Sequence, residues 1–250
     1  MGEEDIASED RTPFERQRRT VRRRAALTRN DVLATALTLV DADGVEAFSM
    51  RRLGKALGRD PMRLYRHASS KDALLDGVVE LVMSKLAVPA LHEVVDWEAG
   101  LRYTAHSFRS IAVEHPHVVP LLVTRPLATP LAMRPLGTLR PLENLLELLV
   151  GAGFDGRGAL HAYRLYFGFL FGHILNELQE QVHNPEETTD LLRLGLHRLP
   201  ALEFPRLRGL AGELATYDGL QELEEGLDIV LEGLRRKLAD QKPNHEVRRG

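Results

Sequence analysis

The stretch from Thr28 to Leu75 is the part of this chain that most narrows the folds it can adopt. It contains four short segments with helix-start residues, each followed by apolar residues at helical spacing. The side chains of Thr28, Ser49 and Asp60 can accept hydrogen bonds from backbone N–H groups in a first helical turn. Pro61 follows Asp60, and proline is well tolerated at the first helical position. The segment therefore predicts a small unit made only of helices.

Two glycines divide this unit. Gly44 follows the first predicted helix, because glycine readily takes the left-handed conformation that ends many helices. Gly58 lies between the second predicted helix and a third over 61–67, and it permits a sharp turn between them. The fourth predicted helix runs from Lys71 to Leu86. Two short helices joined by a tight turn are typical of the helix-turn-helix motif, whose second helix enters the major groove of DNA.

Charge is unevenly distributed, although the chain carries a net charge of only −3. Residues 11–75 carry fifteen Lys and Arg against seven Asp and Glu, whereas the segments 1–10 and 76–250 are both acidic. Such a basic segment suits a polyanionic partner, since each neutralised phosphate releases a condensed counterion. The alternative is an ordinary helical unit with a solvated basic face.

The helical unit resembles the DNA-binding domain of the tetracycline-repressor (TetR) family of bacterial regulators. The resemblance rests on the run FSMRRLGKALG at 48–58, on LYRH at 64–67 and on KDALL at 71–75, and the similar segment covers roughly a fifth of the chain. It implies an all-α protein in which an N-terminal helix-turn-helix domain precedes a larger helical domain for regulation and dimerisation. A dimer would place two recognition helices about one DNA turn apart on a palindromic operator.

The resemblance also implies which residues bind double-stranded DNA. These are Arg51, Pro61, Met62, Arg63, Tyr65, Arg66, His67 and Lys71. Arg63 is the first candidate to read a base edge and Arg51 the second, because a guanidinium group can pair with O6 and N7 of guanine.

The other candidates have less specific roles. Tyr65, His67 and Lys71 match positions that hold phosphates, a task that needs donors rather than a base-specific pattern. Arg66 fits either task. Met62 could contact a thymine methyl group or act as a partly buried spacer. The His67 ring could pack between helices instead of binding a phosphate.

We divide the chain into five parts by sequence. They are a flexible charged arm (1–27), the helix-turn-helix domain (28–75), a connecting helix end and linker (76–95), a ligand-binding and dimerisation domain (96–240) and a C-terminal tail (241–250). The arm has seven arginines from Arg11 to Arg24. They could bind an adjacent minor groove of the DNA or belong to a disordered, soluble tail. The preceding acidic residues would oppose DNA binding if they folded back, and no apolar segment of a signal peptide follows the charges.

The domain 96–240 is expected to sense a ligand and to dimerise. The longest helices are predicted over 156–182 and 218–238, and the family resemblance assigns such a pair to a four-helix interface between two copies. Gly168 and Gly172 would allow close helix approach there, or simple core packing. An effector of unknown identity would bind a mostly apolar pocket with a few polar groups. Its candidate residues, each of which also fits a core role, are Arg102, Phe108, Arg109, Met133, Leu139, Tyr163, Tyr166, Phe167 and His173.

We expect no metal and no cofactor. Thr124-Arg125-Pro126 is similar to a segment of the tetracycline-responsive branch, in which a metal-binding histidine stands three positions earlier. That position holds Leu121, so the resemblance does not carry the magnesium–tetracycline chemistry with it. His115-Pro116-His117 is a weak signal for a metal, and a surface or capping role is favoured for these two histidines.

The sequence offers no signature of an enzyme. It lacks a glycine-rich phosphate loop, a nucleophile elbow and a His-Glu-x-x-His pattern, and it has no cysteine for thiol chemistry or disulfides. It also lacks an apolar run of the ~18–20 residues that span a bilayer, so we expect a cytoplasmic protein. We predict a homodimeric, ligand-responsive transcriptional regulator, a repressor released from its operator by a small molecule. The alternatives are a ligand-independent or nucleoid-type DNA-binding protein and, more remotely, a helical enzyme.

Overall fold

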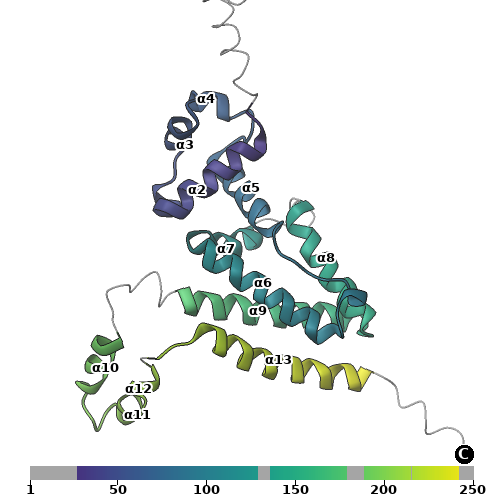
Figure 1. Ribbon diagram of the computed structural model, residues 1–250, viewed down its shortest axis with the longest axis vertical. Coiled ribbons are helices and arrows are strands. Elements are labelled where there is room, and N and C mark those ends of the chain that lie inside the picture. Colours follow the sequence, from purple (N-terminus) through teal and green to yellow (C-terminus); the bar gives the residue numbers. More distant parts are fainter. Residues whose placement is uncertain (1–26, 129–135, 179–188, 215, 242–250) are drawn as a thin grey trace, which may run out of the picture.

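The computed structural model describes residues 27–128, 136–178, 189–214 and 216–241, and within these ranges it contains helices and no strands (Figure 1). The first helices, α2 (Arg29–Ala47), α3 (Met50–Leu57) and α4 (Pro61–Leu64), form a head at one end of the molecule. Helix α5 (Lys71–Met83) leads from this head into a larger helical body. The predicted all-α fold with two parts is confirmed.

The body contains the remaining helices. They are η1 (Leu91–Glu93), α6 (Trp97–Glu114), η2 (Pro116–Val118), α7 (Val119–Ala128), α8 (Leu136–Gly151), α9 (Gly156–Leu178) and α13 (Gly219–Gln241). Between α9 and α13 the chain forms a group of three short helices, α10 (Thr189–His197), α11 (Pro205–Gly209) and α12 (Ala211–Leu214), which lies beyond the ends of α9 and α13 (Figure 1).

Local sequence determines where the helices of the head begin. The Thr28 hydroxyl accepts from the Asp31 N–H while the Asp31 carboxylate accepts from the Thr28 N–H, a reciprocal capping box. The side chains of Ser49, Asp60 and Ser70 accept from a backbone N–H in the first turn of α3, α4 and α5, respectively. These residues satisfy N–H groups that have no partner within their helix, so the predicted helix starts are confirmed.

Glycines shape the turns of the head. Gly44 has φ 77° and interrupts the helical path of α2, and Gly58 has φ 60° at the end of α3. Gly54 is needed for a different reason, because a Cβ atom at this position would lie 2.8 Å from the carbonyl oxygen of Arg59. The turn between α3 and α4 can therefore approach α3 closely only because residue 54 lacks a side chain.

Two of the predicted helices are shorter in the structure. Helix α4 ends at Leu64 rather than at His67, because the N–H groups of His67 and Ala68 both bind the Leu64 carbonyl and form a turn. Helix α5 ends at Met83 rather than at Leu86, where the Ser84 hydroxyl donates to the carbonyl of Leu81.

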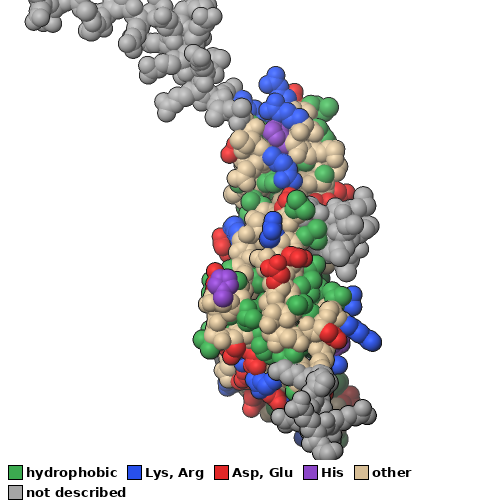
Figure 2. Space-filling view, turned by 90° about the vertical axis from the view of Figure 1, so that its right-hand side faces the viewer, with side chains coloured by type: hydrophobic (Ala, Val, Ile, Leu, Met, Phe, Trp, Pro, Cys, Tyr) green, Lys and Arg blue, Asp and Glu red, His purple; other side chains and the backbone are tan. Residues whose placement is uncertain are grey.

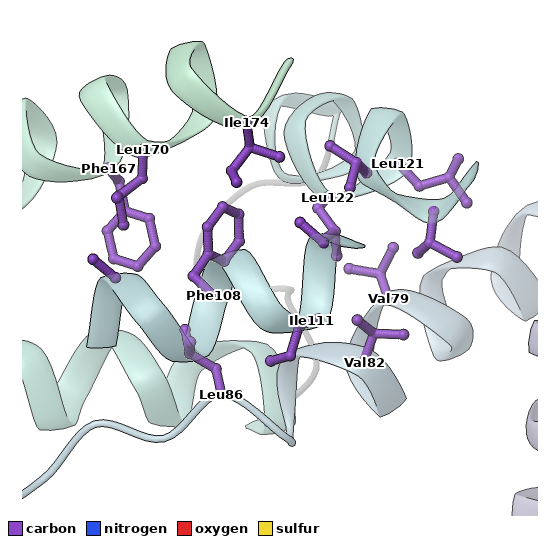
Figure 3. Close-up of a cluster of buried hydrophobic side chains, with 14 of the residues drawn as sticks. Val79, Val82, Leu86, Phe108, Ile111, Leu121, Leu122, Phe167, Leu170 and Ile174 are labelled. Atoms are coloured by element: carbon purple, nitrogen blue, oxygen red, sulfur yellow. The ribbon is translucent and has the colours of Figure 1, made fainter. Parts of the chain in front are cut away.

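The core of the body includes the helix that supports the head. Buried side chains of α5, α6, α7 and α9 and of the segment after α5 form one apolar cluster (Figure 3). Its labelled members are Val79, Val82, Leu86, Phe108, Ile111, Leu121, Leu122, Phe167, Leu170 and Ile174. Because α5 contributes to this cluster and also supports the head, a movement of the body helices can be passed to the head through α5.

Helices α9 and α13 lie antiparallel and leave one apolar face uncovered. A side chain at Gly219 would meet Glu177 and one at Gly226 would meet Phe169, so the start of α13 lies beside the end of α9. On the outer side, Gly168 and Gly172 are exposed, and the apolar side chains of Leu165, Leu175 and Ile229 are exposed as well. The predicted continuation of α9 to residue 182 lies outside the described residues.

Candidate nucleic-acid interface and effector region

The head presents a basic surface at the far end of the molecule. Figure 2 shows Lys and Arg side chains gathered at the end that α3 and α4 form. Arg51 and Arg63 are exposed, and neither guanidinium forms an ion pair within the described part of the chain. Arg52, in contrast, pairs with Asp43 and donates to the carbonyl of Ala47. Arg51 and Arg63 thus remain available to an external acceptor, whereas Arg52 supports the head.

Helix α4, the predicted recognition helix, presents its polar and apolar residues on different sides. Leu64 is fully buried, and the Pro61 ring packs close to Gly54. Met62 is 73% exposed, which disfavours its interpretation as a partly buried spacer. The structure therefore gives Pro61 a packing role and leaves Met62 and Arg63 facing outward.

The phosphate-binding candidates lie in the turn after α4 and at the start of α5. Tyr65 and Arg66 are exposed, and the Arg66 Nε donates to the Nε2 of the half-buried His67 over 3.0 Å. The Lys71 ammonium lies 3.5 Å from the Val45 carbonyl oxygen and above the ring of Phe48. These residues follow Arg63 in the sequence and carry the donors that a phosphate backbone requires.

Four of the predicted effector residues come together in one aromatic cluster. The ring centres of Phe108 and Phe167 are 6.2 Å apart, and those of Tyr163 and Phe167 are 5.2 Å apart. The buried Tyr166 donates its hydroxyl to the Leu101 carbonyl, and burial raises the pKa of this phenol well above its ordinary value. Phe171, absent from the predicted set, lies 5.5 Å from Phe108.

Arg109 and His173 form a second group around a carboxylate that the sequence analysis did not single out. Glu177 is fully buried and accepts hydrogen bonds from Nε and Nη2 of Arg109, the first over 3.0 Å. His173 Nε2 lies 3.5 Å from Glu177, and burial is the main cause of the lowered pKa of this histidine. The available signal was a glutamate in the mostly apolar second half of α9, four residues after His173.

Three effector candidates remain, namely Arg102, Leu139 and Met133. Arg102 pairs with Glu224 and Asp228 of α13. Leu139 is half-buried on α8, and Met133 lies outside the described residues. A hollow of about 380 Å³ lies between the segment 88–93 and helix α8, but none of the predicted effector residues lines it.

Family comparisons identify both parts of the chain. Residues 32–78 match the model of bacterial regulatory proteins of the tetR family, and residues 89–238 match the tetracyclin repressor-like C-terminal domain. The chain belongs to the TetR family. This TetR-family protein is 27% identical to the transcriptional repressor DrrR1 of Streptomyces coeruleorubidus over 82% of its own length and 78% of the relative. It is 29% identical to the class D tetracycline repressor of Escherichia coli over 84% of its length and 93% of that protein.

Structural comparison leads to the same family. The chain resembles ActR of Streptomyces coelicolor, solved in complex with actinorhodin, with a TM-score of 0.72 and 29% identity over 86% of this chain and 99% of ActR. The TetR-family protein is therefore a ligand-responsive, DNA-binding transcriptional regulator that acts as a homodimer. Its family consists of regulators rather than enzymes. Among the described helices, none is long and apolar enough to cross a membrane.

Proposed function

We propose that this protein represses transcription by binding a palindromic operator as a homodimer, and that a small molecule bound in its body releases it. The exposed arginines of the head, Arg51 and Arg63, carry this proposal, because they are basic, unpaired within the described residues and part of the same head as the candidate phosphate donors. Repression is favoured by the curated relatives, which include repressors. The protein would act in the cytoplasm, where bacterial operator DNA lies.

The proposal assigns a task to each part of the chain. Residues 28–75 bind DNA, 76–95 connect, and 96–240 bind the effector and the second copy. The arm 1–27 and the tail 241–250 fall almost wholly outside the described residues, and contact of the arm with a minor groove stays a prediction. The exposed apolar face of α9 and α13, which includes Leu165 and Ile229, supports dimerisation through these helices.

The effector would bind where the aromatic cluster meets the Arg109–Glu177 pair. The contact between Phe108 and Phe171 and the pair of Arg109 with Glu177 both join α6 to α9, so apolar rings and a guanidinium group lie between the same two helices. This combination suits a largely apolar molecule with at least one hydrogen-bond acceptor. Binding would displace α6 or α9 against α5, and a coupling free energy of ~1–3 kcal/mol would weaken operator binding by about 5- to 150-fold.

Substitutions in the head test the proposed reading of DNA. Arg63→Ala is expected to relax base preference at one position of each half-site, with a cost of about 1–3 kcal/mol at that position. Lys71→Ala is expected to weaken all DNA roughly equally and to lower the salt slope by about one. Arg140→Ala, an exposed arginine on α8, is the matched control and should change neither quantity. If Arg63→Ala and Lys71→Ala both weaken binding without altering base preference, the role assigned to Arg63 is wrong.

A further inference from the structure

The His115-Pro116-His117 motif has no role in the proposed function so far, yet both histidines bind one residue of the head. The Nδ1 of His115 lies 2.9 Å from Oδ2 of Asp41, and the Nδ1 of His117 lies 2.8 Å from the backbone carbonyl oxygen of Asp41. Asp41 belongs to α2 of the head and is near the break at Gly44, where helix carbonyls commonly need partners from outside the helix. These contacts, here named the Asp41 joint, connect the head to the body.

His115, the central residue of this joint, is buried and has polar partners on both ring nitrogens. His115 is 6% exposed, and its Nε2 lies 3.1 Å from the Lys85 ammonium, which also pairs with Glu114. The two ring nitrogens of His115 thus face different partners, Nδ1 the carboxylate of Asp41 and Nε2 both the Lys85 ammonium and, at 3.4 Å, the Glu114 carboxylate. The other carboxylate oxygen of Asp41, Oδ1, is buried without a hydrogen-bond partner among the described residues. The Asp41 side chain is 27% exposed, and His115 is the side chain that binds its carboxylate in the described part of the chain.

The position of the joint suggests what it controls. Helix α5 runs from the head into the core of the body, and Arg125 of α7 holds α5 through Asp72 and Asp76. An attachment through α5 alone would leave the head able to pivot about that helix. Helix η2 packs on α2, and the Asp41 joint belongs to this contact, which supplies a second attachment that opposes this rotation.

We propose that the Asp41 joint fixes the orientation of each head and thereby the spacing of the operator half-sites that the dimer accepts. His115 and His117 are thus positioning residues that determine specificity without touching DNA. The inference rests on the proposed function, because only a dimer with two reading heads has a spacing to set.

The test uses the full-length protein and duplexes built from the operator that the wild type selects from random DNA. In a series of these duplexes, one base pair is added to or removed from the centre. The double variant H115A/H117A should lose about tenfold of its preference for the native spacing, equivalent to ~1.4 kcal/mol, while its affinity for an isolated half-site stays unchanged. H115N/H117N should keep the preference, because the amide nitrogen of Asn replaces the Nδ1 donor. His92→Ala, an exposed histidine on η1, is the control and should also keep it.

A further variant separates the effect of the joint on half-site spacing from its effect on stability. D41A/H115A/H117A should recover part of the melting temperature that H115A/H117A loses, because the buried Oδ1 of Asp41 is removed together with its partner, yet its preference for spacing should remain lost. If this variant or H115A/H117A discriminates spacing as the wild type does, the inference is wrong and the proposed function stands. If the wild type itself shows no preferred spacing, the proposed function and the inference both fail.

Discussion

Replacing Arg109 by Met is predicted to destabilise the protein more than replacing Glu177 by Gln. Both side chains belong to one ion pair, but Glu177 is fully buried whereas the Arg109 side chain is 25% exposed. Arg109→Met leaves a carboxylate inside the body without its counter-ion, a change that typically costs about 3–5 kcal/mol. Glu177→Gln leaves a guanidinium that still reaches water, so we expect only the loss of a charged hydrogen bond, about 1.5–3 kcal/mol.

The double variant R109M/E177Q isolates the effect of the unpaired buried charge. It contains no unpaired buried charge, so it should be more stable than Arg109→Met alone, and the two effects should be strongly non-additive. Thermal unfolding measures the difference, provided that the protomer concentration is held constant, because the stability of a dimer depends on it. For a chain of this size, Arg109→Met should lower the Tm by roughly 6–20 °C. Additive effects, or a smaller loss in Arg109→Met than in Glu177→Gln, would refute this account of the pair.

Three further predictions concern other parts of the molecule. Burial lowers the pKa of His173 below its ordinary value of 6.5, so the unfolded chain binds the proton more readily than the folded protein. The free energy of unfolding should therefore fall as the pH drops below about 6.5. His173→Asn should lack this loss when denaturation is compared at pH 7.5 and 5.5. Gly54→Ala should destabilise the head by about 1–3 kcal/mol, because its Cβ would clash with the Arg59 carbonyl oxygen, and an unchanged Tm would contradict the close approach described for this turn. Substituting Leu at both Gly168 and Gly172, where a Cβ meets no atom within 4 Å in the protomer, should preserve folding but shift the protein to monomers in sedimentation; an intact dimer would move the interface away from this face.

The head could be predicted from sequence largely because its determinants are local. The residues that cap its helices stand within three positions of the N–H groups they bind, and Gly44 and Gly58 mark their own turns. The length of α4 was overestimated, because Tyr65 to His67 continue the helical pattern while their backbone forms a turn. That turn depends on hydrogen bonds to the Leu64 carbonyl, which the sequence pattern does not reveal.

The polar groups of the body could not be predicted in the same way. Arg109 and Glu177 are 68 positions apart, and Asp41 and His115 are 74 positions apart, so only the packing of helices brings them together. Helical spacing did indicate the aromatic side chains of α9, because a helix that is apolar nearly all round must be buried on more than one side. It did not reveal that Arg102 is occupied by carboxylates of α13.

Selection of the purified protein against a random pool of double-stranded DNA tests the central claim most directly. We expect enrichment of a pseudo-palindrome with one fixed half-site spacing, bound by two protomers. Enrichment without a common motif, or binding of a specific site by a single protomer, would contradict a dimeric reader of a palindromic operator.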